Sequence, residues 1–451
     1  MPKVSKSTKS VKASKVAKKQ IRKSSKTSSK KTSSAKTSKK SSAKSSSTKW
    51  APSYKKEITM FKNQPDYFQL NEKYAKNGLG TRLIHVGNEP DQEYGGVSTN
   101  LDFSTTFAQP APGTPVVFDY ARCGNPTRLS LERNLASMEH SKYAFACSSG
   151  MAAHITITNL CQRGDHILCV DDVYGGTQRY LRRILGPNAD IEVSFEDFSD
   201  IKYFKKCLRP NTKIVWLETP TNPTLKIFDI AKIAEALKGT GILLCVDNTF
   251  STPVNTNPLL LGADVVTHSL TKYIGGHSDI IAGCICLNNR ELYDKLFFIL
   301  KSMGTGLCAF DSWLMLRSAK TLEVRVGRAN TNAMAVAKTL EASPKVVKVL
   351  YPGLKSHPQH NIAKKQSRGF GGMVSFYVKG GVKNAEKFLK ALKYFTLAES
   401  LGGVESLAEN PALMTHGSVP AAHRKLLGIE DNFIRLSVGI ESEEDLVADI
   451  K

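Results

Sequence analysis

Seven short apolar runs, spread between residues 143 and 286, constrain the fold of this chain more than any other feature. Segments with helical patterning precede or separate most of them, 129–138 among these. Strands that alternate with helices form a mostly parallel sheet, because each connection has to cross back over the sheet. The sequence therefore predicts an α/β protein with a mostly parallel central sheet. Its strands are expected at 143–147, 166–170, 191–195, 213–217, 242–246, 264–267 and 281–286.

The pattern changes after about residue 310. A long helical segment is expected from Asp311 to about Ala342. Further apolar runs and one more helix are expected at 346–350, 373–378, 433–438 and 383–393. We therefore expect a larger domain over 116–310 and a smaller C-terminal α/β domain over 311–451.

Positive charge is concentrated at the N-terminus. Residues 1–49 contain 16 lysines and Arg22 but no acidic residue, whereas the chain from Trp50 onward has 46 basic and 40 acidic residues. A segment of Lys, Ser, Thr, Ala and Val has too little apolar surface to offset its chain entropy, so we expect 1–49 to be disordered. This basic tail could make weak polyanion contacts, direct nuclear targeting or mitochondrial import, or only solubilise the protein.

The nine cysteines form no Cys-x-x-Cys pair, and several lie in apolar runs such as 166–170. This usage predicts buried, reduced thiols and a cytoplasmic protein, with no metal site. No apolar run approaches the roughly 20 residues of a membrane span. The N-terminus also lacks the apolar segment of a secretory signal, so we expect no membrane contact.

Lys272 lies in a sequence that suits imine chemistry, His268-Ser269-Leu270-Thr271-Lys272-Tyr273-Ile274-Gly275-Gly276. Small hydroxyl residues can hold a phosphate, glycines admit a flat ring, and the amine can bind an aldehyde cofactor. Ser-x-Thr-Lys alone also fits a surface loop with an ordinary lysine, so the motif needs support from the rest of the chain.

Four expected strands are followed in turn by Gly150, Tyr174, Asn222 and Asp247, and Lys272 follows a fifth. Open α/β sheets bind ligands outside the carboxyl ends of their strands. The helix that opens at Gly150 can bind an anion with its free backbone N–H groups. An acid at a strand end, such as Asp247, can pair with a ring nitrogen. Because these five residues all follow strands, the sequence predicts one site at this edge of the sheet.

From Thr81 to Asp449 the sequence resembles the Cys/Met-metabolism family of fold-type I pyridoxal-phosphate enzymes, and within it most closely the cystathionine γ-lyases. The resemblance is carried by the segments above and by residues 120–128, 351–360, 398–406 and 435–439. It implies the fold-type I architecture, a pyridoxal 5′-phosphate cofactor and small sulfur amino acids as substrates. It also implies a homotetramer, built as a dimer of dimers with shared active sites, in which residues 50–115 form an arm and a segment that contact the neighbouring subunit.

The resemblance assigns a role to each site residue. Lys272, Tyr174 and Asp247 are the catalytic residues: Lys272 binds the cofactor aldehyde and moves protons, Asp247 pairs with the ring nitrogen, and Tyr174 stacks on the ring. The cofactor phosphate is held by Gly150, Met151, Ser269 and Thr271, with Tyr120 and Arg122 from a neighbouring subunit. The substrate-binding residues are Arg122, Tyr174, Arg179, Asn222, Glu399, Ser400 and Arg435, and Arg435 is expected on the α-carboxylate because a guanidinium binds carboxylates bidentately.

The implied activity is cleavage of cystathionine by γ-elimination to cysteine, 2-oxobutanoate and ammonia, with hydrogen sulfide production as a further outcome. A γ-synthase acting on activated homoserine shares nearly all of these residues and remains an alternative. Gly175-Gly176-Thr177 disfavours a methionine γ-lyase, and the context of Glu399 disfavours a β-lyase. A polyanion-binding protein with an inactive enzyme-like body is the alternative from another class. Thr99-Asn100 stand where relatives usually have a proline pair near the mouth of the site, so substrate preference is open there.

Deleting residues 1–49 should remove any affinity for polyanions and leave enzymatic turnover unchanged. If six or more phosphates are engaged, binding of the full chain to DNA or RNA should fall roughly a thousandfold over a few-fold rise in salt. Titrations of both forms into labelled nucleic acid measure this. Equal binding by the truncated protein would contradict a polyanion-binding tail, and no binding by either form at low salt would favour a solubilising extension.

Overall fold

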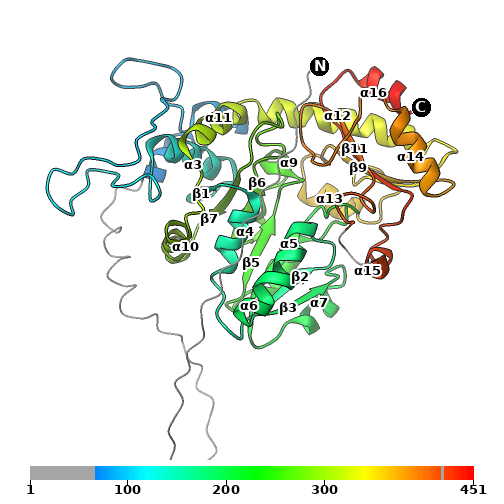
Figure 1. Ribbon diagram of the computed structural model, residues 1–451, viewed down its shortest axis with the longest axis horizontal. Helices are drawn as coiled ribbons and strands as arrows, with labels where there is room; N and C mark the ends of the chain where they lie inside the picture. The colour runs from blue at the N-terminus through cyan, green and yellow to red at the C-terminus, as the bar shows by residue number, and fades with distance from the viewer. Residues whose placement is uncertain (1–66, 418–420) are drawn as a thin grey trace, which may run out of the picture. The chain divides into compact units, whose positions relative to one another are not determined.

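The structure is a computed structural model, which describes residues 67–417 and 421–451 (Figure 1). The basic tail expected at 1–49 and the first part of the arm expected at 50–115 lie outside the described residues. Within the described ranges, no helix combines the length and apolar character needed to cross a membrane.

A seven-stranded sheet forms the centre of the first, larger domain. Its strands are β1 (Tyr143–Cys147), β2 (His166–Val170), β3 (Glu192–Glu196), β4 (Thr212–Glu218), β5 (Leu243–Asp247), β6 (Val265–Ser269) and β7 (Gly283–Leu287). They lie in the order β1-β7-β6-β5-β4-β2-β3, and only β7 runs against the others. Every residue of β1, β2 and β7 is buried, as expected for strands with both faces covered. The carboxyl ends of six strands therefore point toward the same edge.

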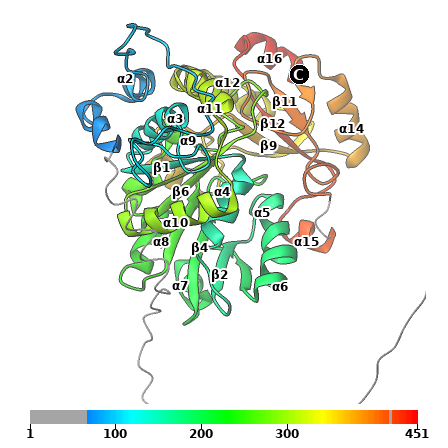
Figure 2. The same ribbon diagram turned by 60° about the vertical axis from the view of Figure 1, so that its left-hand side comes forward.

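Helices precede and connect these strands (Figures 1 and 2). They are η1 (Tyr67–Tyr74), α2 (Leu79–His85), α3 (Pro126–Met138), α4 (Gly150–Thr158), α5 (Gly175–Tyr180), η2 (Leu181–Leu185), α6 (Gly186–Ala189), α7 (Ile201–Cys207), α8 (Ile230–Leu237), α9 (Thr252–Asn255), η3 (Pro258–Leu261), α10 (Arg290–Met303) and α11 (Ala309–Ala319). Two of them, α3 and α4, are capped by side chains: Asn125 accepts the backbone N–H of Arg128, and Ser149 accepts that of Ala152.

A second sheet of five strands forms the C-terminal domain. It contains β8 (Val346–Leu350), β9 (Met373–Val378), β10 (Thr396–Leu397), β11 (Leu407–Glu409) and β12 (Phe433–Ser437), in the order β10-β11-β12-β9-β8. Only β10 and β11 pair in parallel. The helices of this part are α12 (Leu322–Glu341), α13 (His360–Gln366), α14 (Val382–Ala391), α15 (Ala421–Leu426) and α16 (Glu443–Ile450).

Helix α12 contributes to two apolar cores. Leu322 and Val326, near its start, pack in the core of the seven-stranded sheet. Val336 and Leu340, near its end, pack with β9, β12, α14 and α16 in the core of the second sheet. Figure 1 shows α12 running from α11 toward the second sheet. One continuous helix therefore joins the two domains and limits how they can move apart.

The expected strands are confirmed to within two residues at each end. The single helical segment expected from Asp311 to Ala342 is wrong, because α11 ends at Ala319 and α12 begins at Leu322. Between them the hydroxyl of Thr321 donates to the carbonyl oxygen of Ser318 at 3.2 Å, a contact that competes with the helical backbone bonds.

All nine cysteines are free, and five of them are buried. The expectation of buried thiols is wrong for Cys308, which is exposed at the start of α11. Among the described residues no cluster of His, Cys, Asp or Glu side chains has the arrangement of a metal site.

Candidate active site

A cavity of about 400 Å³ lies at the carboxyl edge of the seven-stranded sheet and extends to the second domain. It is lined by segments that follow β1, β2, β4, β5 and β6. The expected residues that line it are Gly150, Met151, Tyr174, Asn222, Asp247, Ser269, Thr271, Lys272, Glu399, Ser400 and Arg435. The structure therefore brings together residues that span almost 300 positions of the sequence.

Lys272 lies in the turn after β6, half-buried in the cavity wall. Its Nζ donates to Ser400 Oγ at 2.9 Å. Burial lowers the pKa of Lys272 to about 8, and the positive charge of Arg435 acts in the same direction. Ser400 has a φ of +100°, a conformation that non-glycine residues rarely adopt and that is common at functional sites. The amine is therefore far easier to deprotonate than an exposed lysine.

Asp247 ends β5, and its Oδ1 accepts hydrogen bonds from Thr249 N at 3.0 Å and Thr249 Oγ1 at 2.6 Å. Its Oδ2 lies 3.4 Å from His154 Nε2. Burial by itself would raise the pKa of Asp247, but the contacts with His154 and Thr249 lower it on balance. The carboxylate therefore stays ionised in a buried position, as a partner for a positively charged ring nitrogen must.

His154 was missed by the sequence analysis. It lies on α4, one helical turn after Gly150, and is buried with its ring edge-on to Trp216 at 4.6 Å between centroids. Its Nδ1 lies 3.0 Å from Thr177 Oγ1 and its Nε2 faces Asp247 Oδ2. In the tautomer with the proton on Nε2, Nδ1 accepts a hydrogen bond from the Thr177 hydroxyl. The only sequence signal for His154 is its spacing of four residues from Gly150. This spacing puts the two residues on the same face of α4, which faces the strand ends.

Glu218, at the end of β4, was also missed. Its two carboxyl oxygens accept from the backbone N–H groups of Tyr174 at 2.9 Å and Asn222 at 3.1 Å. Burial, and secondarily the charge of Asp247, raise the pKa of Glu218. This carboxyl group fixes two site residues from different loops at once. Glu218 can reach both residues because β4, which lies between β2 and β5, leads to Asn222, while the neighbouring strand β2 leads to Tyr174.

Arg435, on β12, is 2% exposed and closely held. Its guanidinium donates to Asn222 Oδ1 and to the carbonyl oxygen of Ser400, both at 2.8 Å, and lies 3.1 Å from Glu409. Burial lowers the pKa of Arg435, and the negative charge of Glu409 opposes the shift. Its Nε has no hydrogen-bond partner among the described residues. A buried donor of this kind favours a carboxylate ligand.

One end of the cavity suits a phosphate. The first N–H groups of α4, from Gly150 and Met151, have no acceptor within the helix, and the side chain of Ser149 satisfies that of Ala152. A Cβ added at Gly150 would lie 3.0 Å from the Ser269 side chain, so the helix start and this hydroxyl already approach closely. Thr271 lines the same cavity, where its hydroxyl donates to the carbonyl oxygen of Ala282 at 3.2 Å.

Three expected residues do not line this cavity: Tyr120, Arg122 and Arg179, all exposed. Arg122 donates from Nη1 to the carbonyl oxygen of Lys301 at 2.5 Å, and its guanidinium lies 5.6 Å from the centre of the Tyr120 ring. Tyr174 is exposed by 42%, but its ring does face the cavity.

An easily deprotonated lysine, a buried ionised carboxylate and a helix start that can bind phosphate define an enzyme with a phosphorylated aldehyde cofactor. The family model described as Cys/Met metabolism PLP-dependent enzyme matches residues 80–451. The chain belongs to this family, pyridoxal phosphate is its cofactor, and the expected fold-type I architecture is confirmed.

Relatives with known names cover most of the chain. The cystathionine gamma-lyase of Dictyostelium discoideum is 51% identical over 373 residues, which are 82% of this chain and 96% of that protein. A cystathionine beta-lyase of Coxiella burnetii is 48% identical over 377 residues, 83% of this chain and 97% of that protein. The crystal structure of cystathionine gamma-lyase from Lactobacillus plantarum, complexed with L-serine, matches with a TM-score of 0.81 at 41% identity and covers 83% of this chain and 97% of that one.

The cofactor-free protein should bind pyridoxal phosphate covalently at a rate that rises with pH up to about 8 and then levels off. Only the neutral amine attacks an aldehyde, so the rate should rise about tenfold per pH unit well below the pKa. Stopped-flow absorbance between pH 6 and 10 measures it. In Arg435→Met, which removes a nearby positive charge, the plateau should move to higher pH. A rate that keeps rising to pH 10 in the unmodified protein would show that Lys272 has an ordinary pKa.

Proposed function

We propose that this chain is a carbon–sulfur lyase that cleaves cystathionine by γ-elimination, giving cysteine, 2-oxobutanoate and ammonia. One observation carries the proposal. Ser400 accepts a hydrogen bond from Lys272 through its side chain and one from Arg435 through its carbonyl oxygen. A proton-transferring amine therefore lies beside the group expected to hold the substrate α-carboxylate. The relative named cystathionine gamma-lyase, at 51% identity, supports the same assignment.

The cavity residues fit the cofactor. Bound pyridoxal phosphate supplies an aldehyde that takes up the amino acid and a ring that withdraws electrons from its Cα. Lys272 would hold the aldehyde carbon, and Asp247, kept ionised by its contacts with His154 and Thr249, would hold the ring nitrogen in its protonated form. Tyr174 would cover one face of the ring. Gly150, Met151, Ser269 and Thr271 would bind the phosphate.

We assign proton transfer to Lys272 and Tyr174. Elimination at Cγ requires removal of one proton from Cα and another from Cβ, so one mobile base has to reach two adjacent carbons. The neutral Nζ of Lys272 can do this, because it sits on a flexible side chain and has a pKa of about 8. The phenol of Tyr174 would donate a proton to the departing sulfur.

Substrate binding is assigned mainly to Arg435. It would hold the α-carboxylate with help from donor groups of Asn222 and Ser400. Asn222 Oδ1 and the carbonyl oxygen of Ser400 already orient its guanidinium. Glu399 lines the cavity beside them and would face the distal part of the substrate. Arg179 and Arg122 do not line this chain's own cavity, and they belong to the proposal only as residues that contact a substrate at the mouth or in a neighbouring site.

The products identify the reaction. Purified protein should form 2-oxobutanoate and cysteine from cystathionine, as detected by mass spectrometry, and Lys272→Ala should form neither because it lacks both the cofactor-binding amine and the base. Pyruvate and homocysteine would indicate instead the β-lyase chemistry named for the Coxiella burnetii relative. Cystathionine formed from an O-activated homoserine and cysteine, at a higher rate than its cleavage, would make the protein a γ-synthase. Methionine, offered separately, should be a poor substrate.

The proposal extends to the assembly. Tyr120 and Arg122 are exposed and lie outside the cavity of their own chain, which is consistent with their serving the phosphate site of a neighbouring subunit. We propose a homotetramer made of two dimers that share their active sites in this way. A cytoplasmic location is also proposed, since nine free cysteines suit a reducing compartment.

Mixing the Arg122→Ala and Lys272→Ala variants should restore activity that neither shows alone. Each hybrid dimer contains one site with an intact Lys272 from one chain and an intact Arg122 from the other. Random exchange should give about a quarter of wild-type activity, because half of the dimers are hybrids with one good site each. Absence of any recovery, with subunit exchange verified by native mass spectrometry, would contradict the shared site.

A further inference from the structure

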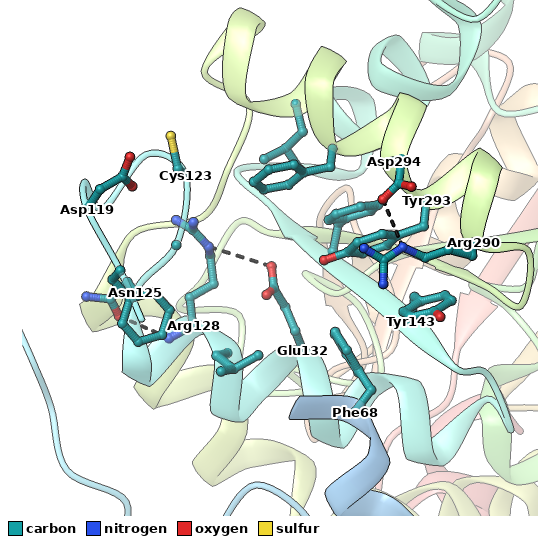
Figure 3. A pocket seen from close by; sticks show the side chains of 16 residues that line it. Phe68, Asp119, Cys123, Asn125, Arg128, Glu132, Tyr143, Arg290, Tyr293 and Asp294 are labelled. Atoms are coloured by element: carbon teal, nitrogen blue, oxygen red, sulfur yellow. Dashed lines mark hydrogen bonds and ion pairs between the residues drawn. The ribbon is translucent and has the colours of Figure 1, made fainter. Parts of the chain in front are cut away.

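Arg128 and Glu132, one turn apart on α3, form an ion pair away from the catalytic cavity. Their Nε and Oε1 atoms are 3.6 Å apart, and the side chains are only 6% and 14% exposed. Figure 3 shows the two side chains pointing toward each other, with the loop that carries Asp119 and Cys123 on one side and α10 on the other. A buried ion pair is weak evidence for a stabilising role, because desolvation offsets much of the attraction.

Arg128 reaches two backbone segments. Its Nη1 donates to the carbonyl oxygen of Leu307 at 3.1 Å, and its Nη2 donates to that of Arg122 at 3.4 Å. The segment between Arg122 and α3 is short, and its end is fixed by Asn125, whose side chain accepts the N–H of Arg128. The guanidinium therefore holds the backbone of the residue expected to enter the neighbouring site.

Glu132 connects this arrangement to the chain's own phosphate-binding turn. Its Oε1 also accepts the N–H of Ala146, on the strand that leads directly to Ser149 and Gly150. Leu307, held by Arg128, donates its own N–H to the carbonyl oxygen of Ala146 at 3.0 Å. One ion pair thus contacts both the strand before the chain's own phosphate site and the segment that carries Arg122.

We propose that Arg128, oriented by Glu132, is a positioning residue that holds Arg122 in the place from which it binds the cofactor phosphate of the neighbouring subunit. This inference rests on the shared site proposed above. It adds a residue that touches neither cofactor nor substrate. It predicts that loss of Arg128 damages mainly the neighbour's site, because the strand before the chain's own phosphate turn keeps its bonds to Glu132 and Leu307. A defect that acts across the subunit boundary distinguishes positioning from general support of the fold.

The protonation of Glu132 decides whether the protein can tolerate removal of Arg128. The pKa of Glu132 is raised to about 7, because burial outweighs the lowering effects of Arg128 and the Ala146 N–H. When Arg128 is removed, Glu132 can take up a proton instead of remaining as an unpaired buried charge. Arg128→Lys retains a positive charge but cannot donate to two carbonyl oxygens with a planar fork, so it serves as the conservative variant.

The test is complementation between variants. Arg128→Ala alone should lose affinity for pyridoxal phosphate and cystathionine turnover by roughly ten- to a hundredfold, as expected when a binding group shifts by about 1 Å. Arg128→Lys should lose less. Mixing Arg128→Ala with Lys272→Ala should restore activity to about the level reached by the Arg122→Ala and Lys272→Ala pair, because the Lys272→Ala chain supplies a correctly held Arg122.

The outcomes separate the two proposals. If Lys272→Ala regains activity when mixed with Arg122→Ala but not when mixed with Arg128→Ala, the positioning role of Arg128 is overturned and the shared site stands. Rescue with neither would overturn the shared site, on which the inference rests. If Arg128→Ala does not fold, as judged by circular dichroism, the same mixing is done with Arg128→Lys, for which no rescue, or no initial loss of cofactor affinity, would equally refute the role.

Discussion

The structure depends on placing Lys272, half-buried in the cavity wall, close to the positive charge of Arg435. Desolvation and that charge together bring the pKa of the lysine to about 8. Two cations in one pocket repel each other, and Glu409 offsets this by lying 3.1 Å from the guanidinium of Arg435. Ser400 then joins the two basic groups through its side chain and its carbonyl oxygen. The proposed carboxylate binding and the proposed proton transfer therefore fall to groups held by the same residue.

Both domains are needed for this arrangement. Lys272 and Asp247 come from the carboxyl ends of parallel strands, where many segments of the chain meet. Arg435 and Glu409 come from paired strands of the second sheet and face each other in register. Helix α12 packs in both apolar cores, so it limits how far the two halves of the site can separate. The fold thus determines where the site residues lie, and a few buried polar contacts determine the charges of their side chains.

Much of this was predictable from the sequence because strand ends share one edge of a parallel sheet. That rule alone groups Gly150, Tyr174, Asn222 and Asp247 with Lys272, and the structure has all five around one cavity. The rule also puts Glu218, which ends β4, at this edge, but it does not give the contacts of Glu218, which depend on which strands are neighbours. It does not place His154, whose direction depends on the rotation of α4. The roles of Tyr120 and Arg122 stay predictions, since a single chain cannot contain a site made by two.

The proposed role of Lys272, to bind the cofactor aldehyde, can be tested directly. Borohydride reduces the bond between a lysine and pyridoxal phosphate and makes it permanent, so the modified peptide can be mapped by mass spectrometry. We expect a yellow protein that loses its visible absorbance on reduction and carries the pyridoxyl group on Lys272 alone. A colourless protein after addition of the cofactor, or a pyridoxyl group on any other lysine, would contradict it.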